Sequence, residues 1–223
     1  MSILGSRLSA VTELLRKCEN NLLFADIGSD HAFLAIEVLR NNIAKKAIAA
    51  DINELPLLKG KENAQSFGVD IDFILSDGFD NLEDLGVTSA AVCGMGGELI
   101  AKIILRSQTA KSALLVLQPM SAQEELRKAL WDNGFTIHKE VFVFDAGKPY
   151  TVMQVTFTGE STEYSYLDLF LGKERIITDE FKKYCQKVLQ SSLKRRMGIV
   201  ARGEDTADID SLIEYCQAQT TSF

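Results

Sequence analysis

The sequence lacks several features that mark secreted, membrane-spanning and metal-binding proteins. Its 223 residues include only four cysteines, and no two of them form a Cys-x-x-Cys pair, so we expect neither a structural zinc site nor a disulfide framework. No apolar run reaches the ~20 residues that a membrane-spanning helix needs. The first residues show no basic segment followed by an apolar core and a cleavage site. These absences predict a cytoplasmic protein with reduced thiols, no metal and no membrane partner.

Positive charge is also scarce. The 24 Lys and Arg residues are outnumbered by 31 Asp and Glu residues, and the formal net charge of −7 excludes a global positive field that would attract nucleic acid. Any contact with RNA must therefore use a local patch. One candidate is the stretch 182–202, in which every charged residue is basic: Lys182, Lys183, Lys187, Lys194, Arg195, Arg196 and Arg202. The alternative is that this stretch forms an ordinary solvated helix face.

The pattern that is present is typical of α/β proteins. Hydrophobic residues make up 46% of the chain, which is enough to form a core. Short apolar runs alternate with longer helical patterns through the first two thirds, and this alternation predicts a parallel sheet with helices on both faces. The expected strands are 22–26, 47–51, 72–75, 90–93 and 114–117, and the expected helices are 7–18, 32–39, 54–67, 97–105 and 122–132.

The last third follows a different pattern. Two strand-like stretches, 136–144 and 150–158, are joined by a turn-forming segment and predict an antiparallel hairpin. Two helical stretches follow, and the spacing of their apolar residues, Leu193 and Met197 among them, predicts that the two helices pack chiefly on each other. These helices are expected at 177–199 and 206–218. We therefore expect an α/β domain at residues 1–160 and a helical domain at residues 161–223.

The most informative motif follows the first expected strand and reads Asp-Ile-Gly-Ser-Asp-His at residues 26–31. Nucleotide cofactors bind at such strand ends in open α/β sheets. A dinucleotide site requires Gly-x-Gly-x-x-Gly, but Asp30 and Phe33 occupy the second and third glycine positions after Gly28. Carboxylates at this strand end repel a pyrophosphate and favour a cation. S-adenosylmethionine carries an ammonium and a sulfonium but no phosphate, so the motif favours this methyl donor over a dinucleotide.

Three later strand ends carry candidate contacts for the same cofactor. Asp51 is placed to accept hydrogen bonds from ribose hydroxyls, and the alternative is that it caps the following helix. Asp77, followed by Gly78, is placed to accept a bond from the adenine amino group, and the alternative is a plain Asp-Gly turn. In the glycine-rich segment Cys93–Glu98, the backbone can come very close to a ligand and shape the space between the methyl group and its acceptor. The alternative is that the glycines only allow a tight turn packed against a helix. Its cysteine is expected to be a buried apolar residue rather than a nucleophile.

Several motifs together carry a resemblance to a known family: Arg7-Leu8, Ala25–Leu34, Gly94-Met95-Gly96-Gly97, Leu117-Gln118-Pro119 and Gly147-Lys148-x-Tyr150. Over essentially its whole length, the chain resembles the bacterial tRNA (adenine(22)-N1)-methyltransferase (TrmK) family. This resemblance implies a Rossmann-like class I methyltransferase sheet, mostly parallel with an antiparallel C-terminal hairpin, and a coiled-coil-like C-terminal unit. It also implies S-adenosyl-L-methionine as cofactor and N1-methylation of an adenine at position 22, in the D-arm of tRNA.

The chain departs from the family pattern at two positions. The family reads Gln-Pro-Asn where this chain has Gln118-Pro119-Met120, so we expect one hydrogen bond to be lost there. The family often has Glu where this chain has Asp51, and either carboxylate can hold a ribose. The first departure bears on the identity of the substrate, and the second does not.

The candidate residues fall into three groups. Expected cofactor contacts are Asp26, Gly28, Ser29, Asp51, Ile52, Asp77, Gly78, Gly94 and Met95. Expected substrate contacts are Arg7, Gly96, Lys148, Tyr150, Lys194, Arg195 and Arg196. Asp30 is expected to stabilise the positive charge of the methylated adenine, and His31 to orient the base or move a proton, unless it only caps or packs a helix. Phe33 and Tyr150 are either stacking partners of the base or core residues.

Other functions remain open at this point. One is a methyltransferase that acts on a small molecule or a protein instead of tRNA. Another is a cofactor-binding or RNA-binding module without activity, which the intact set of strand-end carboxylates disfavours. A nicotinamide dehydrogenase is disfavoured by the missing glycines. We expect a monomer or a weak homo-oligomer.

Overall fold

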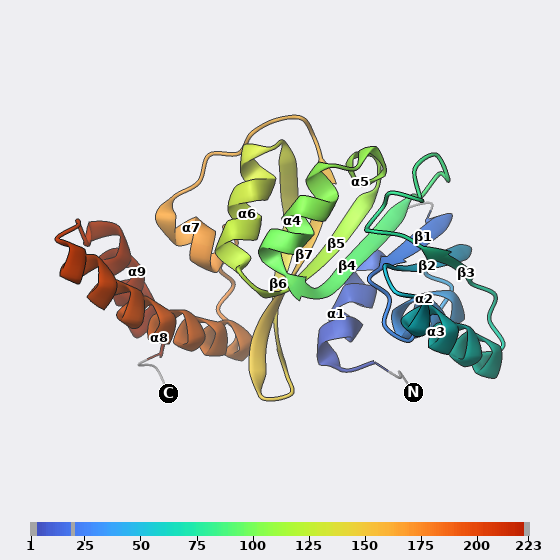
Figure 1. Cartoon of the computed structure of the whole chain (residues 1–223). Coiled ribbons are helices and arrows are strands. Elements are labelled where there is room, and N and C mark those ends of the chain that lie inside the picture. Colours follow the sequence, from blue (N-terminus) through green and yellow to red (C-terminus); the bar gives the residue numbers. More distant parts are fainter. Residues whose placement is uncertain (1–3, 19–20, 221–223) are drawn as a thin grey trace.

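The computed structural model describes residues 4–18 and 21–220, and a seven-stranded sheet of order β3-β2-β1-β4-β5-β7-β6 forms its centre (Figure 1). The strands are β1 (Leu23–Ile27), β2 (Lys46–Asp51), β3 (Asp72–Leu75), β4 (Ser89–Gly96), β5 (Leu114–Ser121), β6 (Phe135–Asp145) and β7 (Lys148–Phe157). The first five run parallel, and β7 pairs antiparallel with both β5 and β6. The predicted sheet with its antiparallel hairpin is thus confirmed.

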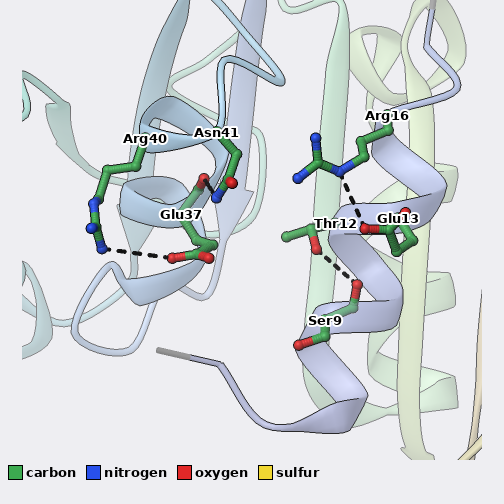
Figure 2. A pocket seen from close by; sticks show the side chains of 7 residues that line it. All are labelled: Ser9, Thr12, Glu13, Arg16, Glu37, Arg40 and Asn41. Atoms are coloured by element: carbon green, nitrogen blue, oxygen red, sulfur yellow. Dashed lines mark hydrogen bonds and ion pairs between the residues drawn. The ribbon is translucent and has the colours of Figure 1, made fainter. Parts of the chain in front are cut away.

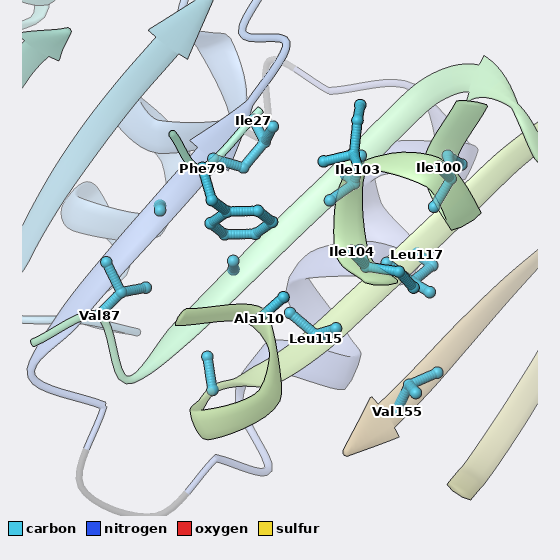
Figure 3. Packing of buried hydrophobic residues seen from close by; sticks show 14 of the residues in the cluster. Ile27, Phe79, Val87, Ile100, Ile103, Ile104, Ala110, Leu115, Leu117 and Val155 are labelled. Atoms are coloured by element: carbon cyan, nitrogen blue, oxygen red, sulfur yellow. The ribbon is translucent and has the colours of Figure 1, made fainter. Parts of the chain in front are cut away.

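Helices cover both faces of this sheet. One face is covered by α1 (Ser6–Leu15), α2 (Phe33–Arg40) and α3 (Glu54–Phe67), and the other by α4 (Gly97–Leu105), α5 (Gln108–Ser112) and α6 (Gln123–Asp132) (Figure 1). Successive residues of a strand point to opposite faces, so Phe24 packs under the first group of helices and Ala25 under the second. Figure 3 shows the core between the sheet and the second group of helices, where Ile100 and Ile104 of α4 lie over Leu115 and Leu117 of β5.

The C-terminal part is helical, as predicted. It contains α7 (Tyr166–Leu171), α8 (Asp179–Arg202) and α9 (Ala207–Thr220), and α8 and α9 pack on each other as an antiparallel pair (Figure 1). The expectation that Leu193 and Met197 contribute to this packing is wrong, because they are 44% and 68% exposed. None of the helices within residues 4–18 and 21–220 combines the length and the apolar character needed to cross a bilayer.

A buried polar network joins the helical part to the sheet. Arg127 of α6 is 0% exposed, and its guanidinium donates to the carboxylate of Glu140 in β6, with the Nη2 to Oε1 distance at 2.6 Å. Its Nη1 donates to the carbonyl of Leu169 in α7 at 2.5 Å, and its Nη2 to the hydroxyl of Tyr184 in α8 at 3.4 Å. The hydroxyl of Thr151 donates to the same carboxylate. One ion pair therefore ties α6, the hairpin, α7 and α8 together.

Candidate active site

A cavity of about 460 Å³ opens at the carboxyl ends of β1, β2 and β4. From β1 the strand order runs to β2 and β3 on one side and to β4 on the other, so the cavity lies at the point where the winding of the sheet reverses direction. Ligands of open α/β sheets bind at such points. The lining residues are Arg7, Leu8, Asp26, Gly28, Asp30, His31, Phe33, Leu34, Asp51, Cys93, Gly94, Met95 and Met120. The structure therefore brings together the first, second and fourth strand ends singled out in the sequence.

Asp26 supplies a buried carboxyl group at the end of β1. It is 6% exposed, and its Oδ2 accepts a hydrogen bond from the hydroxyl of Ser29 at 2.8 Å. Burial raises the pKa of Asp26 to about 6, the bonds from Ser29 and from the backbone at Ala35 oppose this shift, and the negative charge of Asp51 adds to it. A cationic ligand in the cavity would offset both causes of the rise. The site is thus suited to a positively charged group.

Two glycines let the backbone come close to this cavity. Gly28 has φ +73, in the left-handed region, and a Cβ built there would lie 2.0 Å from the Cε atom of Met95. Gly94 has φ +79, and the pairing of β4 with β5 shifts register at this point. Both conformations favour glycine over any residue with a Cβ. The Met95 side chain consequently lies directly over the turn after β1.

Asp51 ends β2 and keeps part of its hydrogen-bonding capacity. Its Oδ1 accepts bonds from the Asn53 backbone N–H at 2.8 Å and from the Asn53 side chain at 3.3 Å. The N-cap of α3 is Asn53, without a side-chain capping bond, so Asp51 does not cap the helix. Because a carboxylate accepts through two oxygens and both bonds from Asn53 go to Oδ1, Asp51 has further acceptor capacity for a ligand in the cavity that it lines.

The third strand end lies apart from the cavity. The carboxylate of Asp77 pairs with Arg106, with Nη2 2.9 Å from Oδ1, and the same nitrogen donates to the Asp77 carbonyl at 2.7 Å. Arg106 thus holds the Asp77-Gly78 turn, a contact that the sequence did not indicate. The predicted cofactor and substrate contacts that do not line the cavity are Ser29, Ile52, Asp77, Gly78, Gly96, Lys148, Tyr150, Lys194, Arg195 and Arg196.

The opposite wall of the cavity is organised by Gln118, which belongs to one of the family motifs but was not among the expected site residues. Gln118 of β5 is 0% exposed, and its Oε1 accepts bonds from Arg7 Nη1 at 2.7 Å and from the Gly94 N–H at 3.1 Å. The Arg7 guanidinium also lies 5.6 Å from the ring centre of Tyr150. The sequence does contain a feature that could have pointed to this residue, because Gln118 is the polar residue that interrupts the apolar run of this strand.

Met120 retains a contact where a lost hydrogen bond was expected. Arg7 Nη1 lies 3.0 Å from the Met120 sulfur, which is a weak acceptor. The Met120 sulfur thus accepts one weak hydrogen bond from Arg7. Met120 is also 39% exposed, so its side chain faces the open part of the cavity.

Asp30 and His31 lie side by side at the mouth of the cavity. His31 Nε2 is 3.2 Å from Asp30 Oδ1, and the His31 ring centre is 5.9 Å from that of Phe33. The N-cap of α2 is Ala32 rather than His31.

Burial, with the nearby charge of Asp26, raises the pKa of the Cys93 thiol, so Cys93 stays protonated and is no nucleophile.

The three candidates on α8 lie elsewhere. Arg195 pairs with Glu124 at 3.0 Å, and Arg196 pairs with Asp210 at 2.5 Å. Lys194 is exposed.

Lys148 and Tyr150 line a second cavity of about 390 Å³, which shares the lining residue Met120 with the first cavity.

A polar cavity of about 280 Å³ lies between α1 and α2 (Figure 2). Its two arginines each lie near a carboxylate, because Arg16 pairs with Glu13 at 3.2 Å and Arg40 lies 3.9 Å from Glu37, whose buried Oε2 accepts no hydrogen bond from the described residues. Within the described ranges, no group of three or more His, Cys, Asp or Glu side chains could hold a metal ion.

Comparisons with known proteins agree with this geometry. A family model described as a methyltransferase domain matches residues 4–153. The tRNA (adenine(22)-N(1))-methyltransferase of Bacillus subtilis is 30% identical over 173 residues, which cover 76% of this chain and 71% of that protein. The chain belongs to the tRNA (adenine(22)-N1)-methyltransferase family.

Solved structures of similar proteins share the fold of this family over the whole chain. The structure of Streptococcus pneumoniae Sp1610 in complex with S-adenosyl-L-methionine has 26% identity and a TM-score of 0.82, and covers 98% of this chain and 100% of that chain. The structure of the Bacillus subtilis m1A22 tRNA methyltransferase TrmK has 25% identity and a TM-score of 0.76, covering 99% and 97%. The resemblance stated from the motifs is thereby confirmed, and the chain is a methyltransferase.

Proposed function

We propose that this protein transfers the methyl group of S-adenosylmethionine to N1 of the adenine at position 22 of tRNA, in the cytoplasm. The observation that carries the proposal is the acidic cavity at the switch point of the sheet, which lies beside an arginine held by Gln118. The activities named for the similar proteins support the same reaction.

The residues of the cavity suit the methyl donor. Asp26 offers a buried carboxylate for the cationic part of the cofactor, and Asp51 has an oxygen for the ribose hydroxyls. The turns at Gly28 and Gly94 admit a ligand close to the backbone. A volume of about 460 Å³ lies within the range of small-molecule sites. When bound, S-adenosylmethionine supplies an electrophilic methyl group.

The protein's own residues then position and stabilise the acceptor. Adenine N1 is already a nucleophile with a lone pair, so holding the base in line with the methyl group supplies most of the catalysis, an effect of up to ~7–11 kcal/mol. The base must leave its stack to reach the site, and Phe33, which is 37% exposed, offers an aromatic surface to it, whereas Tyr150 is a buried residue, 7% exposed. Methylation makes the base cationic, and Asp30 at the mouth of the cavity stabilises that charge while His31 orients the base.

Methyl transfer to defined transcripts tests the proposal. Unmodified tRNA with adenine at position 22 is incubated with labelled S-adenosylmethionine, and a transcript that differs only in carrying guanine there is the control. We expect N1-methyladenosine, identified by nucleoside mass spectrometry, from the first transcript and no label in the second. Equal labelling of both, or transfer only to a small molecule or a protein, would rule out the proposed acceptor.

We predict that cofactor binding depends on pH through Asp26. The ionised carboxylate of Asp26 binds the cationic cofactor. The affinity for S-adenosylmethionine should therefore rise with pH up to about 6, the pKa of Asp26 in the protein without ligand, and level off above it. Below that value the dissociation constant should increase by up to about tenfold per pH unit, and binding should release a proton. Calorimetry from pH 5 to 8, in buffers of different ionisation enthalpy, measures both. An affinity that is flat over this range would contradict the role of Asp26.

Gln118 is expected to act as a positioning residue for Arg7. The Gln118→Leu substitution removes the acceptor shared by Arg7 and the Gly94 N–H, and leaving a buried donor unsatisfied costs about 1–3 kcal/mol. We expect kcat/KM for tRNA to fall about 10- to 100-fold with a smaller change in cofactor affinity. Gln118→Glu keeps an acceptor and should restore part of the loss, whereas equal loss in both variants would contradict a positioning role.

A further inference from the structure

The two cavities of the active-site region continue into a third. The cavity of about 390 Å³ shares Met120 with the cofactor cavity, and a cavity of about 360 Å³ shares Pro149, Lys187 and Gln190 with the second. Together the second and third form a groove between the β6–β7 hairpin and α8, which lie next to each other in Figure 1. The groove therefore leads from the proposed methyl-acceptor side of the active site along the start of α8.

Three lysines from both walls of this groove face into it. Lys148 comes from the hairpin, and Lys183 and Lys187 lie four residues apart on one face of α8. The Lys183 ammonium lies 4.4 Å from the ring centre of Phe144, and that of Lys187 lies 5.7 Å from the ring centre of Tyr184. Within residues 4–18 and 21–220, none of the three pairs with a carboxylate.

The electrostatics at Lys187 favour an anion in the groove. Burial lowers the pKa of Lys187, the charge of Glu124 opposes this shift, and the positive charges of Arg127 and Lys148 add to it. Glu124 itself already pairs with Arg195. An anion between Lys148 and Lys187 would relieve the repulsion between two like charges that the fold holds near each other.

The three arginines of the basic stretch on α8 differ in this respect. Arg195 and Arg196 pair with Glu124 and Asp210, and Arg202 pairs with Glu204 at 2.6 Å. These charges are compensated within the protein, so they add little to the attraction of an anionic partner. The sequence pattern placed Lys183 and Lys187 in one basic stretch with these arginines, and the structure separates the lysines of the groove from the paired arginines.

We propose that Lys148, Lys183 and Lys187 bind successive phosphates of the RNA strand that carries the target adenine, and that this groove guides the strand into the active site. This inference rests on the proposed function and adds a binding surface to it. Two apolar side chains beside the lysines, Met120 and Phe144, are each 39% exposed and offer surfaces for bases or riboses. A cationic groove with interleaved apolar and aromatic groups is typical of binding to single-stranded nucleic acid.

The test compares the double variant Lys148→Ala/Lys187→Ala with Lys45→Ala. Lys45 is an exposed lysine beside the amino end of β2, at the opposite edge of the sheet from the cavity. Binding of fluorescent tRNA is measured by anisotropy at several salt concentrations, together with KM, kcat and the affinity for S-adenosylmethionine.

We expect the double variant to bind tRNA at least about tenfold more weakly, with KM raised more than kcat is lowered, and with unchanged cofactor affinity. The slope of log affinity against log salt should decrease by about 1.4, for two lost contacts to a single strand. Lys45→Ala should behave as wild type. Equal tRNA binding by the double variant and Lys45→Ala would overturn the inference while leaving methyl transfer intact.

Two further outcomes separate the inference from the function. If the wild-type protein bound tRNA through the groove but did not methylate it, the proposed function would fail and the binding surface would stand. If the groove bound polyglutamate and not tRNA, and the double variant lost that binding, the partner would be an acidic polypeptide and the inference would be overturned.

Discussion

Replacing Asp26 with Asn is expected to weaken binding of S-adenosylmethionine about 10- to 100-fold, because a hydrogen bond to a charged group contributes about 1.5–3 kcal/mol. The same substitution should stabilise the protein without ligand. Burial raises the pKa of Asp26 to about 6 from 3.8, so the folded state binds the proton more tightly than the unfolded state does. The contribution of this group to stability therefore falls as pH rises from about 4 to about 6, by on the order of 1–3 kcal/mol, and stays low above that.

Calorimetry and thermal unfolding of the free protein measure these two effects at pH 7.5. Asn keeps an oxygen that can accept the bond from the Ser29 hydroxyl, so the local hydrogen bond survives while the charge is removed. Ser29→Ala is a matched control that removes this bond and keeps the charge, and it should change cofactor affinity less. A variant that lost stability and kept its affinity for the cofactor would show that Asp26 supports the fold and not the ligand.

Replacing Arg127 with Met is expected to destabilise the protein by about 3–5 kcal/mol, because it leaves the carboxylate of Glu140 buried without its partner. It also removes the bond to the Leu169 carbonyl, which ties α7 to α6. Chemical denaturation at neutral pH measures the loss.

The double variant Arg127→Met/Glu140→Met provides the control. Replacing both partners of a buried ion pair by apolar residues of similar size is often neutral or stabilising, so the double variant should regain much of the lost stability. Thr151 and Tyr184 would each lose a partner, which limits the recovery. A double variant that was less stable than Arg127→Met alone would show that the carboxylate has other partners that matter more than the arginine.

The layout of the sheet and of the cofactor site followed from local patterns. Apolar runs ending in acidic residues marked β1 and β2, and because parallel strands end at one edge, Asp26 and Asp51 were expected together and do line one cavity. Two short helices were not predicted. The helix α5 has five residues, and α7 has six with a capping box between Ser165 and Asp168, so neither is long enough to show helical periodicity.

The features that escaped prediction depend on contacts between distant residues. Arg127, Glu140 and Tyr184 are polar or charged side chains, which sequence patterns assign to the surface, yet they meet in the interior of the protein. The pairing of Asp77 with Arg106 has the same character, since neither residue indicates the other in the sequence. Likewise, only the folded chain distinguishes Lys187, which lies in the groove, from Arg196, which is paired with Asp210.

A crystal structure with S-adenosylhomocysteine tests the proposed site most directly. We expect the ribose of the product to lie within hydrogen-bonding distance of Asp51, its amino group near Asp26, and its sulfur to face the side of the cavity formed by Arg7 and Met120. Ligand density in the polar cavity between α1 and α2 instead, with the cavity at the ends of β1, β2 and β4 empty, would contradict this assignment.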